Sequence, residues 1–138
     1  QMSNGAEARA RMAKAAWAMI LMVAVGLAVV QGKSAEDHMM DAIKQHKVQI
    51  FSKSYCPYCK NAKSVFEKMG VEYHADELDQ MSNGAEIQAE LAKLTGQRTV
   101  PNIFIDGKHL GGNDDCVRAK ESGKLATLLK DAGVKFEL

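Results

Sequence analysis

Residues 48–59 read VQIFSKSYCPYC and join a short apolar run to a pair of cysteines. The run Val48–Ser52 is typical of a buried strand. Pro57 suits the first turn of a helix, because it has no N–H that would lack a partner there. Apolar residues then recur at helical spacing from Ala62 to Met69, and Gly70 follows as a stop. The stretch therefore predicts a strand that leads directly into a helix, with both cysteines at the start of the helix.

The position of the two cysteines indicates redox chemistry. A helix start has unpaired N–H groups and the positive end of the helix dipole, so it favours a thiolate at Cys56. Lys53 adds a positive charge three residues upstream. Two sulfurs three residues apart can meet, so Cys59 can resolve a mixed disulfide formed at Cys56. The alternative is a zinc site that combines Cys56, Cys59 and Cys116 with a histidine, but no second CxxC or HxxxH spacing supports it.

The flanking sequence predicts alternating helices and strands. The order is helix, strand, helix, strand, helix, two strands in a hairpin, and a broken final helix. The expected ranges are 35–46, 48–52, about 57–69, 71–74, 86–94, 102–105 with 108–110, and 114–132 with a break at Gly123. A β-α-β unit pairs its strands in parallel, and Asp106-Gly107 closes an antiparallel hairpin. We therefore predict an α/β fold with a small mixed four-stranded sheet flanked by helices.

Thr99-Val100-Pro101 precedes the third expected strand. Proline is tolerated at the head of a strand because no ladder bond is needed from it there. Taken alone, this is an ordinary turn proline. A cis bond before Pro101 would instead turn the Val100 backbone outward as a free edge that can pair with an extended peptide.

Three motifs together resemble the dithiol glutaredoxins: FSKSYCPYC at 51–59, IQAELAKLTGQRTVP at 87–101 and GGNDD at 111–115. The resemblance covers roughly residues 36–132, and CPYC in place of CGPC separates it from thioredoxin. It implies the thioredoxin fold, a catalytic Cys56 and a resolving Cys59. It also implies that glutathione is the co-substrate. The glutathione-binding residues that it implies are Lys53, Tyr58, Gln88, Arg98, Thr99, Val100, Pro101, Gly112, Asn113, Asp114 and Asp115.

The chemistry of these residues complements the charges of glutathione. Lys53, Gln88 and Arg98 can converge on the glycyl carboxylate, where arginine binds as a planar fork. Asp115 can hold the γ-glutamyl ammonium, while backbone N–H groups at the helix start receive the neighbouring carboxylate. Each residue taken singly would be read as solvated surface or as a helix cap.

The implied activity is reduction of protein disulfides and protein–glutathione mixed disulfides through the Cys56/Cys59 dithiol. A glutathione-ligated iron–sulfur carrier is the alternative. We expect no resident metal, a monomer, and disulfide-bonded or glutathionylated client proteins as partners. The 138 residues carry a net charge of +1 with 6% aromatic residues, so composition gives no case for a nucleic-acid binder.

The first 32 residues form a basic, apolar leader. Ala15–Val30 contains no charged residue, and a short positive segment precedes it. We expect residues 12–32 to be a secretory signal peptide, cleaved after Gly32, or a signal anchor; an organellar segment is the further alternative. The expected location is the secretory-pathway lumen or the exterior, with membrane association only through residues 15–30. QMSNGAE occurs at both 1–7 and 80–86, so residues 1–11 are interpreted as an upstream remnant and 36–138 as the functional domain.

Overall fold

The computed structural model describes residues 32–138. The upstream remnant at 1–11 lies outside the described residues, and so does the leader at 12–32 except for Gly32; both remain predictions. Within 32–138, no helix is long and apolar enough to cross a membrane. The elements are α2 (Ala35–Gln45), β1 (Val48–Ser52), α3 (Pro57–Lys68), β2 (His74–Glu77), the 3-10 helix η1 (Leu78–Gln80), α4 (Gly84–Thr95), β3 (Asn102–Ile105), β4 (Lys108–Gly111), α5 (Asn113–Ser122) and α6 (Lys124–Asp131).

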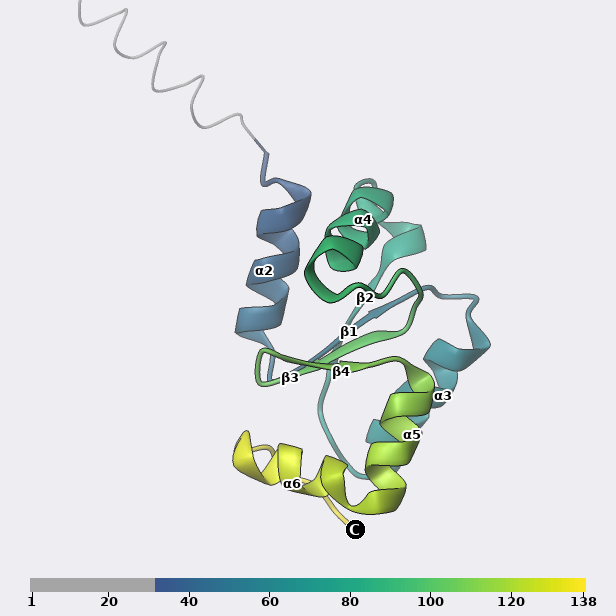
Figure 1. Cartoon of the computed structure of the whole chain (residues 1–138), viewed down its shortest axis with the longest axis vertical. Helices are drawn as coiled ribbons and strands as arrows, with labels where there is room; N and C mark the ends of the chain where they lie inside the picture. Colours follow the sequence, from purple (N-terminus) through teal and green to yellow (C-terminus); the bar gives the residue numbers. More distant parts are fainter. Residues whose placement is uncertain (1–31) are drawn as a thin grey trace, which may run out of the picture. The chain divides into compact units, whose positions relative to one another are not determined.

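The strands form one mixed four-stranded sheet in the order β2-β1-β3-β4 (Figure 1). β1 pairs in parallel with β2 and antiparallel with β3, and β3 pairs antiparallel with β4. The β3–β4 turn has positive φ at both Asp106 (50°) and Gly107 (78°), as a two-residue hairpin turn requires. The predicted α/β fold with a four-stranded mixed sheet is confirmed.

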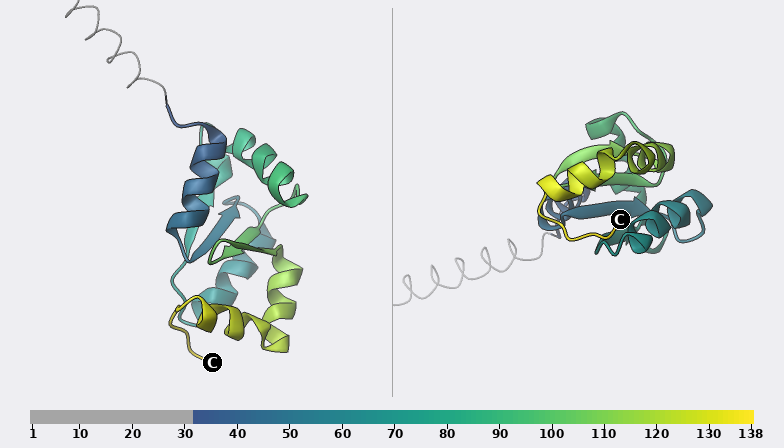
Figure 2. Two further views of the ribbon diagram at one scale, coloured as in Figure 1. Left: turned by 60° about the vertical axis from the view of Figure 1, so that its left-hand side comes forward. Right: turned by 90° about the horizontal axis from the view of Figure 1, so that it is seen from below.

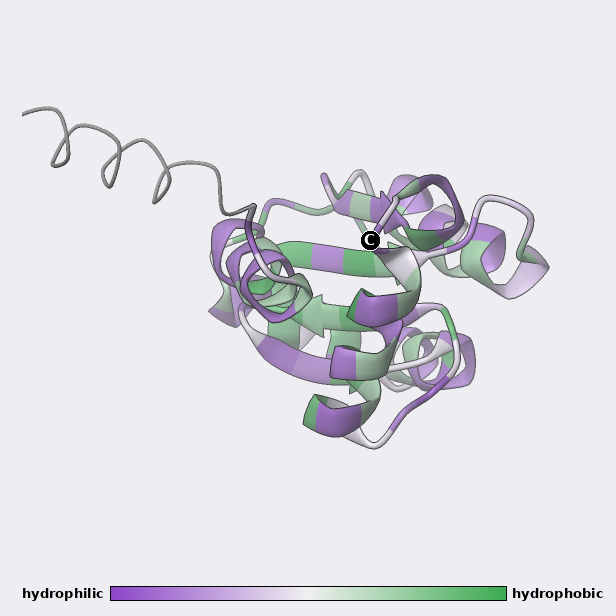
Figure 3. Ribbon diagram, turned by 90° about the horizontal axis from the view of Figure 1, so that it is seen from above, coloured by the Kyte–Doolittle hydropathy of each residue, from purple (hydrophilic) through white to green (hydrophobic). Residues whose placement is uncertain are grey.

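Helices cover both faces of the sheet, each over its own hydrophobic cluster (Figure 2). α3, α5 and α6 pack on one face, while α2 and α4 pack on the other. The colouring in Figure 3 is mainly hydrophobic along the central strands, whereas the helices carry both hydrophilic and hydrophobic segments. This three-layer arrangement buries the central strands β1 and β3, whereas the edge strands β2 and β4 are partly exposed.

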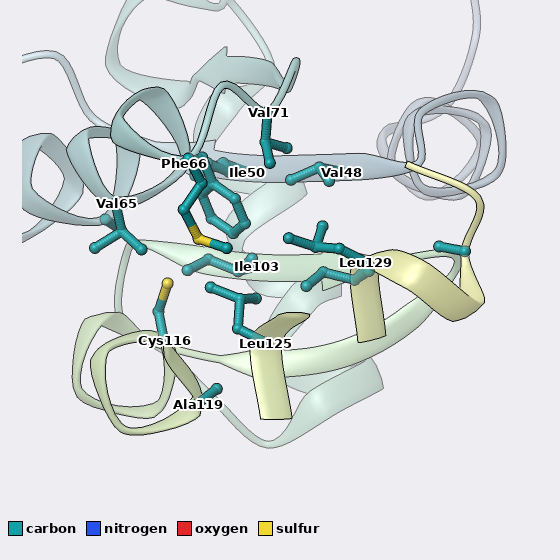
Figure 4. Close-up of a cluster of buried hydrophobic side chains, with 14 residues drawn as sticks. Val48, Ile50, Val65, Phe66, Val71, Ile103, Cys116, Ala119, Leu125 and Leu129 are labelled. Atoms are coloured by element: carbon teal, nitrogen blue, oxygen red, sulfur yellow. The ribbon is translucent and has the colours of Figure 1, made fainter. Parts of the chain in front are cut away.

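The central strand β1 supplies side chains to both clusters, and all five of its residues are buried. Val48 and Ile50 point into the α3/α5/α6 cluster, which also contains Phe66 and Cys116 (Figure 4). Phe51 points into the α2/α4 cluster. Because successive side chains on a strand alternate, this short strand joins the two halves of the core.

β2 begins later than the sequence predicted. The expected strand at 71–74 is wrong, because Val71 ends the α3 segment, donating its N–H to Phe66 O at 3.0 Å, and the strand runs from His74 to Glu77. Two polar side chains contact Asp76 in this strand. The Gln49 side chain donates to Asp76 Oδ2 at 3.2 Å, and His38 Nε2 lies 3.6 Å from the same oxygen.

The α4 helix is longer than predicted, and its last leucine is exposed. It spans Gly84–Thr95 rather than 86–94, with Ile87 and Leu91 in the core. Leu94 is 51% exposed, because the α2/α4 cluster includes no residue of α4 beyond Leu91. Gly96 then ends the helix with a φ of 77°, a left-handed conformation that suits glycine.

Candidate functional site

Cys56 lies at the N-cap of α3, where the chain turns out of β1. Its N–H donates to Lys53 O at 3.1 Å, which closes the turn, and its Sγ accepts the Cys59 N–H at 3.3 Å. A sulfur at an N-cap that receives a backbone N–H has a partner that favours its negative charge. The predicted placement of the cysteines at a helix start, with Pro57 in the first turn, is therefore confirmed.

The two cysteines differ in how far they are buried. Cys56 is 9% exposed, whereas Cys59 is fully buried. The pKa of Cys59 is raised to about 11; burial is the main cause, and the hydrogen bond with Cys56 is the second. Because the thiolate is the attacking species, Cys59 is a poor nucleophile at neutral pH. Of the two thiols, Cys56 is therefore the one that a molecule in solution can reach.

A loop from the other side of the sheet lies against the dithiol. The Cys56 thiol donates to Val100 O at 3.8 Å, and the Val100–Pro101 bond is cis. The backbone before β3 thus lies beside the sulfur at the start of α3.

An open groove of about 520 Å³ extends from this loop. Its lining joins the first turn of α3, the segment before β3 and the start of α5. Eight of the eleven predicted glutathione-binding residues line it: Tyr58, Thr99, Val100, Pro101, Gly112, Asn113, Asp114 and Asp115. The structure therefore brings together residues that are up to 57 positions apart in the sequence.

At one end of the groove, Asp115 closes the start of α5. Its Oδ2 accepts the Gly112 N–H at 3.0 Å, and its Oδ1 accepts from Arg118 at 2.7 Å. These two hydrogen bonds lower the pKa of this carboxyl below its usual value; the bond from the Gly112 N–H has the larger effect, and the bond from Arg118 has the next largest. Asp115 is therefore ionised at neutral pH, and each oxygen keeps a second lone pair for another donor.

Lys53, Gln88 and Arg98 do not line the groove. Gln88 donates to the Arg98 carbonyl at 2.8 Å, so these two residues are adjacent. The hydrogen bonds from the Ser54 hydroxyl and N–H are the main causes that lower the pKa of Asp79, and the positive charge of Lys53 adds a smaller contribution. Their convergence on one carboxylate of a ligand stays a prediction.

Two polar residues beside the site were missed by the sequence analysis. Gln97 lines the groove, and its side-chain amide donates to two carbonyls of the loop. Asp79 accepts the Ser54 N–H at 2.9 Å and also the Ser54 hydroxyl, so it holds the turn before Cys56. Gln97 lies inside the recognised motif at 87–101, whereas nothing local marks Asp79, since its partner is 25 residues away.

The remaining cysteine belongs to the core. Cys116 has no exposed surface, and burial raises its pKa to about 11. Within residues 32–138, no group of three or more histidine, cysteine or carboxylate side chains is arranged to hold a metal ion. The zinc arrangement considered from the sequence is therefore not formed by this part of the chain.

We predict that only Cys56 reacts rapidly with alkylating agents in the folded protein. In Cys56→Ser, Cys59 and Cys116 should react with iodoacetamide at pH 7 at least tenfold more slowly than a free cysteine, because burial keeps both protonated. Mass spectrometry after timed alkylation measures this, and urea-unfolded protein is the control in which both should react. Rapid labelling of Cys59 in the folded variant would contradict the assignment.

Comparison with known proteins identifies the family of this chain. Residues 48–110 match the family model described as Glutaredoxin. The chain is 50% identical over 121 residues to glutaredoxin-C8 of Oryza sativa subsp. japonica, covering 86% of this chain and 89% of that relative. It is 54% identical over 99 residues to glutaredoxin-C4 of Arabidopsis thaliana, covering 72% of this chain and 73% of that relative.

Solved structures agree with these sequence relatives. The crystal structure of a buckwheat glutaredoxin–glutathione complex aligns with a TM-score of 0.70 at 43% identity, covering 72% of this chain and 90% of that one. The holo form of glutaredoxin C1 from Populus tremula x tremuloides aligns with a TM-score of 0.70 at 39% identity, covering 72% and 99%.

Proposed function

Because this chain belongs to the glutaredoxin family of glutathione-dependent oxidoreductases, we propose that it reduces protein–glutathione mixed disulfides and protein disulfides through Cys56 and Cys59. The observation that carries the proposal is the position of the Cys56 sulfur. It caps a helix start, accepts the Cys59 N–H and lies beside the Val100 carbonyl at the groove. A disulfide can therefore meet this sulfur while the rest of a ligand occupies the groove.

The first route uses Cys56 alone. The Cys56 thiolate attacks the glutathione sulfur of a mixed disulfide, and the client sulfur leaves as a thiolate that takes up a proton. Cys56 is then glutathionylated. A second glutathione thiolate attacks the glutathione sulfur of this intermediate, which releases oxidised glutathione and restores the Cys56 thiolate.

The second route adds Cys59. Cys56 attacks a client disulfide and forms a mixed disulfide with the client. Cys59, three residues along α3 and buried beside Cys56, then loses its proton and attacks the Cys56 sulfur, so the client leaves as a dithiol. Two glutathione molecules subsequently reduce the internal disulfide and leave as oxidised glutathione.

We propose that glutathione lies along the groove with its two ends in opposite electrostatic surroundings. The cysteinyl backbone would pair with Val100, and the γ-glutamyl ammonium would meet Asp115. The neighbouring carboxylate would accept backbone N–H groups at the start of α5, where the helix dipole favours an anion. The glycyl carboxylate would face Arg98 and Lys53. The low pKa of Asp115 and its spare lone pairs support the anionic end of this arrangement.

The test compares two mixed disulfides of the same peptide, one with glutathione and one with cysteamine. Cysteamine offers the same disulfide but lacks both charged ends of glutathione. With the full chain, we expect kcat/KM to be at least tenfold higher for the glutathione adduct, since each charge-assisted hydrogen bond contributes about 1.5–3 kcal/mol. Equal values would contradict glutathione recognition. A brown protein with visible absorption after anaerobic purification, and with no reductase activity, would support the iron–sulfur carrier instead.

A further inference from the structure

The amide of Gln97 bridges two points of the loop that precedes β3. Its Nε2 donates to Thr99 O at 2.9 Å and to Pro101 O at 2.9 Å. An amide NH₂ has two hydrogens, so these two bonds use its full donor capacity. The residue between the two carbonyls is Val100, whose carbonyl lies beside the Cys56 sulfur.

This bridge fixes the direction of the Val100 N–H. The Thr99 carbonyl and the Val100 N–H belong to one peptide unit, and this unit is trans. In a planar trans peptide the C=O and N–H point in opposite directions. When the Thr99 carbonyl points at the Gln97 amide, the Val100 N–H must point away from it.

Gln97 is itself held from two elements. Its own N–H donates to Thr95 Oγ1 at 3.1 Å, and that hydroxyl donates to Leu91 O in α4 at 2.8 Å. Asn102 in β3 donates to the same hydroxyl at 3.4 Å, and its Oδ1 lies 2.8 Å from His109 Nε2 in β4. The bridge is therefore attached to the end of α4 and to the sheet, rather than to a free loop.

We propose that Gln97 is a positioning residue that orients the Val100 N–H for the cysteinyl carbonyl of glutathione. This inference rests on the proposed function, because it presumes that glutathione pairs with Val100. Gln97 acts through the backbone: the two bonds of its amide go to protein carbonyls. A ligand without a peptide backbone gains nothing from this orientation, so the contribution of Gln97 is selective for glutathione.

Gln97→Glu is the decisive variant, because it keeps the shape of the side chain and removes both donors. A carboxylate has no hydrogen to donate and would face two carbonyl oxygens. We expect kcat/KM on the glutathione adduct of the peptide to fall about tenfold, with the loss mainly in KM, as for the removal of one or two neutral hydrogen bonds. Activity on the cysteamine adduct should change less than twofold.

The pH dependence separates positioning from a general structural role. Protonated glutamic acid can donate one hydrogen bond. The difference in kcat/KM on the glutathione adduct between wild type and Gln97→Glu should therefore become smaller as the pH is lowered from 8 to 5. Gln45→Glu is the charge control, because Gln45 is exposed at the end of α2 and does not line the groove; it should match wild type on both substrates.

The outcomes are distinguishable. If wild type shows no preference for the glutathione adduct, the proposed function is contradicted. If wild type shows that preference and Gln97→Glu keeps it, the positioning role is wrong. An equal loss on both substrates would also overturn it, because that result indicates damage to the fold rather than to the Val100 backbone.

Discussion

Cys56→Ser is expected to abolish reduction of glutathionylated peptide, lowering kcat/KM by about a thousandfold or more, as for the loss of a nucleophile. The reason is that no other described cysteine can replace it. Cys59 and Cys116 are fully buried, and burial raises the pKa of each to about 11. Steady-state turnover of the glutathione adduct, coupled to reduction of oxidised glutathione, measures the effect.

The matched control is Cys59→Ser. In the first proposed route only Cys56 is needed for removal of glutathione, so this variant should keep that activity within a fewfold of wild type. It should lose most reduction of client disulfides, because no second thiol then resolves the mixed disulfide. Substantial turnover by Cys56→Ser, or loss of deglutathionylation in Cys59→Ser, would show that the roles of the two sulfurs are wrongly assigned.

Gly84→Ala is expected to destabilise the fold by about 1–3 kcal/mol, the typical range for overpacked core positions. A Cβ at Gly84 would lie 1.8 Å from the Leu78 carbonyl oxygen and 2.7 Å from its carbon. Both are backbone atoms, and Leu78 is itself buried in the α2/α4 cluster, so a rotamer change cannot relieve the clash. Urea unfolding followed by circular dichroism measures the loss.

Ser82→Ala is the control for this prediction, since Ser82 is exposed two residues away and should change stability by less than about 0.5 kcal/mol. A Gly84→Ala protein as stable as wild type would mean that η1 moves freely relative to α4. The result also bears on the duplicated QMSNGAE, because the copy at 80–86 contains this glycine at a position where the fold requires it.

The sequence predicted those elements whose apolar spacing or turn residues are local. Ser34 caps α2, with its Oγ accepting the Asp37 N–H at 3.0 Å, and Asp106-Gly107 forms the expected hairpin turn. β2 was misplaced because its residues, His74–Glu77, show no apolar alternation. It pairs with β1, and its Asp76 accepts a hydrogen bond from Gln49, which is 27 residues away, so no local pattern could reveal its position.

The same distinction applies to the site. The dithiol and the residues that line the groove lie in the three sequence motifs at 51–59, 87–101 and 111–115. These motifs carried the family resemblance. Asp79 was missed because its contacts to Ser54 arise only when the end of β2 lies beside the end of β1. Gln97 was inside a quoted motif, but its role depends on how the loop folds back on its own carbonyls, which spacing does not encode.

Because Cys59 is completely buried, a molecule in solution can reach the dithiol only at the Cys56 sulfur. Once the internal disulfide has formed, solvent reaches only its Cys56 side, so incoming glutathione must join at the same atom that first met the client. Both proposed routes, and their reversals, would therefore share one form of the protein, with glutathione attached to Cys56. A single covalent modification of the Cys56 sulfur would therefore block both proposed routes.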